Sequence, residues 1–99
     1  MSEKGGKERG RKTARQLERH LKGVANHRRI EILMLIAVRD GIILEDIADT
    51  LACNLKTISA HTRKLVQAGL VTKKYQGQCV EHSLSPYGKI MHSFLRILE

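Results

Sequence analysis

The sequence predicts a mostly α-helical domain with a small β-hairpin, an α+β fold of about five helices and two hairpin strands. Apolar residues recur at three- and four-residue intervals along most of the chain, which is the spacing of helices that bury one face. Between Gly69 and Ser85 this spacing changes to alternation, which is typical of strands. The chain has 99 residues, 41% of them hydrophobic, so we expect one domain with a thin core.

The first twelve residues predict a disordered basic arm. They show no apolar periodicity and contain three glycines and five Lys or Arg against two Glu. Such an arm either contacts nucleic-acid phosphates or keeps the chain soluble, and we favour the second because nothing in the sequence positions the arm. The folded domain is expected over residues 13–99.

Two helices are expected to open the domain. From Thr13, a narrow apolar stripe of Leu17, Leu21 and Val24 predicts a helix at the edge of the core. Asn26 then offers a cap for a second helix, which is apolar on nearly all sides and is the predicted core helix. One of its faces is formed by Ile30, Leu33, Met34 and Ala37. Its other apolar residues are Ile32, Leu35, Ile36 and Val38.

A short strand and a short acidic helix follow. Residues 39–41, Arg-Asp-Gly, interrupt the helical spacing, and Ile42 with Ile43 predicts a strand. Helical spacing then returns in Leu44, Ile47, Ala48 and Leu51. The next turn covers residues 52–54. Glycine is common at the first position of such a turn, and an alanine there in the left-handed conformation costs about 1 kcal/mol. We expect Cys53 to face the core.

The segment NLKTISAHTRKLVQAG predicts a helix over residues 54–68. Asn54 is a capping residue, Gly69 is a helix stop, and Ile58, Leu65 and Val66 share one face. The other face carries polar and cationic side chains, namely Lys56, Thr57, Ser59, Ala60, His61, Arg63, Lys64 and Gln67. No Asp or Glu occurs in residues 50–80. This pattern is typical of a helix that reads a DNA major groove, and the alternative is a solvated face that only maintains solubility.

The sequence LVTKKYQGQCVEHSL predicts a β-hairpin next to this helix. Its tip is expected at residues 76–78, Gln-Gly-Gln, and Val80, His82 and Leu84 alternate with more polar neighbours. Lys73 and Lys74 give the hairpin its positive charge. A helix followed by such a hairpin predicts a winged helix-turn-helix domain.

Ser85 and Pro86 are expected to start a last helix. Its apolar stripe, broadened by Ile97, is wider than a domain of this size can cover, so we expect this helix to form a homodimer interface. The predicted interface residues on this helix are Tyr87, Ile90, Met91, Phe94, Leu95 and Leu98.

With these elements in place, LKGVANHRRIEILMLI, IADTLACNLKTISAHTRKLVQAGLV and the Gln-Gly-Gln tip resemble ArsR-type winged helix-turn-helix regulators in order and spacing, over residues 17–84. The resemblance implies a homodimer whose two recognition helices enter successive major grooves while the hairpins contact flanking backbone. It also implies that both terminal helices form the dimer interface, which adds Leu17 and Leu21 of the first helix to the predicted interface residues. The sequence departs from the metal-sensing members, because Ile43 and Glu45 stand where those members carry paired thiolates. His27 also replaces a proline that is frequent in the family.

No cofactor or metal is expected. The remaining donors lie on separate predicted elements without CxxC or i, i+4 pairing, and they are Cys53, Cys79, His61, His82 and His92. Both cysteines are expected to be reduced thiols, and Cys79 in the hairpin is the more accessible of the two.

The net charge of +8 favours a polyanionic partner. Aromatic residues make up only 3% of the chain, which favours double-stranded DNA over single strands that stack on exposed rings. The longest apolar run, residues 32–38, is far shorter than the ~20 residues of a membrane span, and the N-terminus is charged where a signal peptide is apolar. A cytoplasmic location without membrane contact is therefore expected.

These observations predict a sequence-specific DNA-binding transcriptional regulator, a repressor, that reads the major groove with the helix over residues 54–68. The alternative is a winged-helix protein-interaction module within a larger assembly. An enzyme is not expected, because the sequence contains no nucleophile elbow, no paired catalytic carboxylates and no phosphate-binding glycine loop. The predicted DNA contacts are Lys56, Thr57, Ser59, Ala60, His61, Arg63, Lys64, Lys73, Lys74, Gln76 and Gln78.

Overall fold

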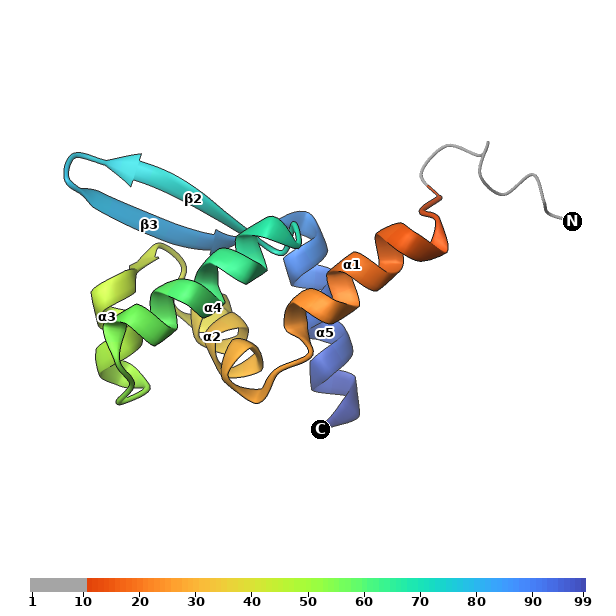
Figure 1. The fold of residues 1–99 in the computed structure, drawn as a ribbon, viewed down its shortest axis with the longest axis horizontal. Helices are drawn as coiled ribbons and strands as arrows, with labels where there is room; N and C mark the ends of the chain where they lie inside the picture. The colour runs from red at the N-terminus through yellow and green to blue at the C-terminus, as the bar shows by residue number, and fades with distance from the viewer. Residues whose placement is uncertain (1–10) are drawn as a thin grey trace, which may run out of the picture.

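The computed structural model describes residues 11–99, which form five helices and a small antiparallel sheet. In chain order the elements are α1 (Ala14–Val24), α2 (His27–Val38), β1 (Ile42–Ile43), α3 (Leu44–Thr50), α4 (Leu55–Gln67), β2 (Val71–Gln76), β3 (Cys79–Leu84) and α5 (Pro86–Leu98). The predicted α+β fold is therefore confirmed. In Figure 1, α1 extends from one end of the domain and the β2–β3 hairpin from the other. The predicted arm lies mostly outside the described residues.

The first helix begins at a capping box. The Thr13 hydroxyl accepts a hydrogen bond from the backbone N–H of Gln16, and the Gln16 side chain accepts one from the backbone N–H of Thr13. Two of the backbone donors that a helix start leaves unpaired are thereby satisfied. Of the predicted stripe, Val24 is buried whereas Leu17 and Leu21 remain about half exposed. α1 is therefore fixed at its C-terminal end and open along its apolar side.

The core is centred on α2, as predicted. Ile32, Leu33 and Ile36 are its most deeply buried residues, at most 1% exposed. Val38 is 74% exposed, because it lies at the last residue of the helix, where the chain turns outward. The side chain of Asn26 caps the helix by accepting hydrogen bonds from two backbone N–H groups, as predicted.

The helix-turn-helix consists of α3 and α4, which are joined by a tight turn. The strand that precedes α3 pairs with the sheet. β1 pairs with β3, with Ile42 opposite His82, and α3 follows directly. The turn to α4 places Ala52 in the left-handed region at φ 51°, as predicted. Cys53 is partly buried and packs against the core cluster. Asn54 then caps α4 through hydrogen bonds to Lys56 N and Thr57 N.

The hairpin and α5 complete the domain. β2 and β3 pair from Val71 opposite Leu84 to Gln76 opposite Cys79, so the tip is one residue shorter than predicted and Gln76 belongs to β2. The β1 strand adds to β3 and gives the sheet order β1-β3-β2.

Ser85 connects the hairpin to α5. Its hydroxyl accepts a hydrogen bond from Gly88 N and donates one to Gly69 O at 2.6 Å. A Cβ on Gly88 would collide with the carbonyl oxygen of Leu70, so glycine allows α5 to approach the chain at this point. The start of α5 is therefore fixed directly against the end of α4. None of the helices in residues 11–99 is long and apolar enough to cross a membrane.

Candidate nucleic-acid interface

The α4 helix is held by one buried face. Ile58, Thr62 and Leu65 are spaced by four and three residues and are almost inaccessible to solvent. Thr62 was not predicted to be buried, although its position four residues after Ile58 and three before Leu65 places it on the same helix face. Its hydroxyl, in a side chain only 1% exposed, has no hydrogen-bond partner within residues 11–99. The buried face fixes the direction of the remaining side chains.

The opposite face of α4 is polar and cationic. Of the predicted contact residues on this helix, Lys56, Thr57, Ala60, Arg63 and Lys64 are exposed. Ser59 and His61 are partly buried at the edges of the same face. The structure therefore brings the predicted α4 residues together on one accessible surface.

The two lysines of the hairpin do not share a face. Lys73 lies opposite His82 and Lys74 opposite Glu81 in the β2–β3 register. Successive residues of a strand point to opposite sides, and residues directly opposite each other point to the same side. Lys73 is therefore on the side of the buried His82, which faces α4, and Lys74 is on the other side next to an acidic residue. The sequence placed both lysines in one group because it did not supply this register.

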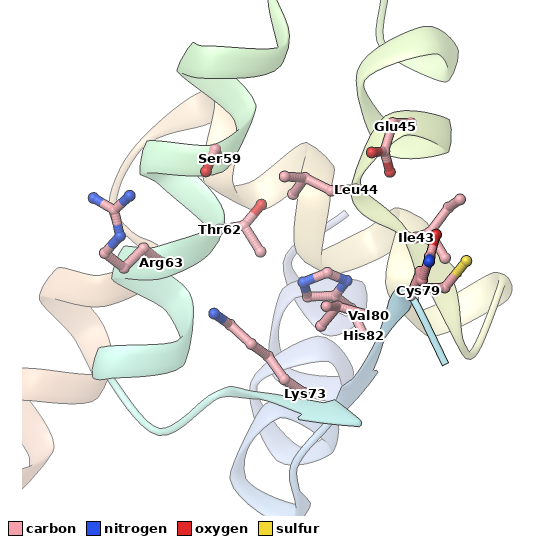
Figure 2. Close-up of a pocket in the computed structure, with 11 residues that line it drawn as sticks. Ile43, Leu44, Glu45, Ser59, Thr62, Arg63, Lys73, Cys79, Val80 and His82 are labelled. Atoms are coloured by element: carbon pink, nitrogen blue, oxygen red, sulfur yellow. The ribbon is translucent and has the colours of Figure 1, made fainter. Parts of the chain in front are cut away.

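A pocket of about 310 Å³ separates the hairpin from α3 and α4 (Figure 2). We call it the wing pocket, and its lining residues are Ile43, Leu44, Glu45, Ser59, Thr62, Arg63, Lys73, Gln78, Cys79, Val80 and His82. Figure 2 shows Lys73 reaching from β2 toward α4, and Glu45 of α3 across the pocket from Lys73. Residues 50–80, which contain the predicted contact residues, include no Asp or Glu. The fold nevertheless places the carboxylate of Glu45, from α3, in the same pocket as Arg63 and Lys73.

Two histidines near this surface have lowered pKa values. Burial is the main cause that lowers the pKa of His82 below 6.5, and its Nδ1 lies 3.1 Å from Ile42 O. Since a carbonyl only accepts, Nδ1 carries the proton of the neutral ring. Burial also lowers the pKa of His61, and the positive charges of Arg29 and Arg28 lower it further. Both rings are therefore neutral at pH 7.

Six of the eight predicted dimer residues, all except Leu95 and Leu98, line an apolar groove between α1 and α5. The groove has a volume of about 500 Å³ and is lined by Lys12, Leu17, His20, Leu21, Leu70, Tyr87, Ile90, Met91 and Phe94. Of the predicted set, Met91 is only 8% exposed and belongs to the core of the single chain, and Leu95 is partly buried against that core. Large apolar surface remains on the other six residues.

Two of the predicted metal donors, Cys79 and His82, line the wing pocket. Residues 11–99 contain no group of three or more His, Cys, Asp or Glu arranged to hold a metal ion. Cys79 is exposed on the hairpin, whereas Cys53 is partly buried.

Comparison with known proteins identifies the family. The model of the MarR family matches residues 25–76, from the start of the α2 segment to the end of β2. The chain belongs to the MarR family. No curated protein matches the sequence significantly. The part of the chain that matches contains the whole helix-turn-helix.

Solved structures with the same fold include regulators of the predicted ArsR type. One is a homodimeric winged helix-turn-helix DNA-binding domain from Mycobacterium bovis, described as a possible ArsR-family regulator, with 28% identity, a TM-score of 0.77, and coverage of 85% of this chain and 78% of that chain. HlyU from Vibrio cholerae has 27% identity, a TM-score of 0.77, and coverage of 86% and 92%. The transcriptional regulator HlyU from Vibrio vulnificus has 28% identity, a TM-score of 0.73, and coverage of 86% and 88%.

The family and these structures together define the class of the protein. It is a DNA-binding transcriptional regulator of the winged helix-turn-helix type and not an enzyme. The predicted likeness to ArsR-type regulators is confirmed by the solved structures, while the family model adds the MarR assignment.

Proposed function

We propose that the protein is a homodimeric, sequence-specific repressor that reads duplex DNA with α4. One observation carries this proposal. α4 buries Ile58, Thr62 and Leu65 in the core and presents an opposite face with cationic and short polar side chains and no carboxylate. A rigid helix with this face fits the width and the charge of a major groove.

The position along α4 divides the contact residues into two groups. Lys56, Ser59 and Ala60 lie in the first two turns, where helix-turn-helix proteins reach base edges. The second group lies later on α4 or on the hairpin and is suited to phosphates, which position a protein without reading sequence. Its members are Arg63, Lys64, Lys73, Lys74, Gln76 and Gln78. Thr57 and His61 lie beside the base-contacting residues of the first group and complete the proposed contact surface.

The apolar groove supports a homodimer. Tyr87, Ile90 and Phe94 line one side of the groove and Leu17 and Leu21 the other, and all five are about half exposed or more. Groups of exposed apolar side chains mark interaction surfaces. The homodimeric domain from Mycobacterium bovis, which is similar to this chain, supports a second copy as the partner. Two recognition helices then address half-sites about 34 Å apart.

Selection of bound sequences from random duplexes tests specificity, and transcription in vitro from a promoter that carries the selected site tests repression. We expect an inverted repeat to be enriched and transcript to decrease as protein is added. Uniform, weak binding to all duplexes would instead support the protein-interaction module, and increased transcript would show activation.

A further inference from the structure

A second cationic site lies at the C-terminal end of α4 and shares Lys64 with the predicted contact residues. We call it the basic hollow. It is about 410 Å³ in volume and is lined by Arg19, Lys22, Gly23, Arg29, Lys64, Gln67 and Ala68. These residues come from α1, α2 and α4, so only the fold brings them together.

The hollow exists because α1 and α4 approach closely at this point. A Cβ on Gly23 would collide with the side chain of Ala68, so the glycine allows direct contact between the two helices. His20 adds a hydrogen bond from α1, with its Nδ1 2.7 Å from Ala68 O. Arg29 of α2 donates from Nη1 to Gly23 O at 3.2 Å, which ties the third helix to the same point. The cationic side chains are thus mounted on a rigid junction.

Positive charge in the basic hollow is mostly uncompensated. No Asp or Glu lines it among residues 11–99. Lys22 pairs with Glu18 at 3.3 Å, whereas Arg19, Arg29 and Lys64 have no ion pair in the described part of the chain. The Nε donor of Arg29 is buried without an acceptor in residues 11–99.

The hollow is also placed where DNA backbone would pass. Lys64 follows Lys56 by eight residues, which is about 12 Å along a helix. The major groove of B-DNA is about 12 Å wide, so a helix with its first turns at the bases has its last turns near the phosphates at the groove edge. Lys64 belongs both to the proposed contact surface and to the hollow, so the two are continuous.

We propose that the basic hollow binds a backbone phosphate of the duplex through Arg19 and Arg29, and extends the DNA footprint from α4 onto α1 and α2. This inference rests on the proposed DNA-binding function. According to this proposal, α1 and α2 add to the affinity for DNA, beyond the contacts made by α4 and the hairpin.

Arg19→Gln tests this site, and Arg15→Gln is the matched control. Arg15 is an exposed arginine on the same helix that does not line the hollow, so both variants lose the same charge from α1. A lost phosphate contact reduces the slope of log affinity against log salt by about 0.9, which is about fivefold in affinity at 0.15 M salt. We expect this loss for Arg19→Gln on selected and random duplexes alike, and a smaller, diffuse effect for Arg15→Gln.

Arg29 provides a second variant pair. Arg29→Gln is expected to reduce the salt slope in the same way, and Arg29→Lys, which keeps the charge, is expected to restore most of it. If the cations only stabilised the ends of α1 and α4, Arg19→Gln and Arg29→Gln would lower the melting temperature and leave the salt slope unchanged, which would overturn the proposal.

Two further results separate the possible failures. Equal salt slopes for Arg19→Gln and Arg15→Gln, with wild-type protein bound to DNA, would overturn the phosphate site alone, whereas absence of wild-type binding would overturn the proposed function as well. A melting temperature raised by inorganic phosphate in wild type but not in Arg19→Gln, with unchanged DNA salt slopes, would assign the hollow to a free anion instead.

Discussion

Two surfaces of the single chain differ in what they leave unsatisfied. The surface of α4 and the hairpin has uncompensated positive charge, whereas the surface of α1 and α5 has uncovered apolar side chains. On α4 and the hairpin, exposed Lys and Arg have few nearby carboxylates. On α1 and α5, exposed Leu, Ile and Phe side chains have no apolar cover among the described residues. A polyanion would compensate the charge of the first surface, and another apolar surface would cover the second. The comparison shows that the two surfaces suit partners of different chemistry.

His20 joins the two surfaces. Its Nδ1 lies 2.7 Å from Ala68 O at the end of α4, and its ring centroid is 5.0 Å from that of Tyr87 in the apolar groove. The ring is buried, and its sequence position on a polar helix gave no indication of this. His20 therefore contacts both the backbone at the end of α4 and a residue of the apolar groove.

The largest expected effect follows from a charge on the apolar surface. Phe94→Asp places a carboxylate in the groove and should give a monomer, because an unpaired buried charge is costly. A monomer loses the simultaneous binding of two half-sites, so DNA affinity should fall about 100-fold or more. Light scattering and fluorescence anisotropy measure the two effects, and Ser93→Asp, an exposed neighbour outside the groove, is the control. A proven monomer with wild-type affinity would contradict the coupling.

The next effect concerns the link between the surfaces. His20→Ala removes a buried hydrogen bond and leaves a cavity against Tyr87, so the free energy of unfolding should fall by about 2 to 4 kcal/mol. His27→Ala, at an exposed position on α2, should change it by less than about 0.5 kcal/mol. Urea denaturation measures both. Equal effects of the two substitutions would show that His20 does not join the surfaces.

A third test divides the α4 and hairpin surface itself. Lys56→Ala should cost about 1 to 3 kcal/mol on the selected duplex and relax preference at one or two base positions. Lys73→Ala, on the side of the hairpin that faces α4, should weaken binding to all sequences alike and reduce the salt slope by about 0.9. Competition with single-base variants of the duplex measures preference. Identical base preferences and salt slopes for the two variants would contradict the division into base-contacting and phosphate-contacting residues.

The smallest effect is a pH dependence from His61. Its pKa in the free protein lies below 6.5, so the ring is neutral at pH 7. A nearby phosphate favours the protonated ring and raises its pKa in the complex. DNA affinity should therefore increase as pH falls below about 6.5, by at most about tenfold per pH unit, until the pKa of the free protein is passed. Binding by His61→Gln should lack this increase, and an identical increase in the variant would assign the proton elsewhere.

The elements of the fold were predictable because their signals are local. Asn26, Asn54 and Ser85 cap their helices in the structure, and Gly69 ends the segment of α4 at φ 79°. Each of these residues acts within a few positions of itself, so a single sequence contains the information.

The candidate site was predictable only where it lies on one element. The exposed face of α4 follows from its period, but the opposite orientations of Lys73 and Lys74 depend on pairing across the hairpin. Glu45 in the wing pocket and Arg19 in the basic hollow reach their places through contacts between elements distant in the sequence. Periodicity within a segment carries no information about such contacts.

One titration tests most directly whether duplex DNA binds the surface of α4 and the hairpin while a second copy of the chain covers the surface of α1 and α5. Wild-type protein is titrated, at 0.15 M salt, onto a duplex selected from random sequences and onto a shuffled duplex of the same composition, with affinity and stoichiometry measured together. The account predicts two chains per selected duplex, on half-sites about 34 Å apart, bound at least about 10³-fold more tightly than the shuffled duplex. One chain per duplex, or equal affinity for the two sequences, would contradict it.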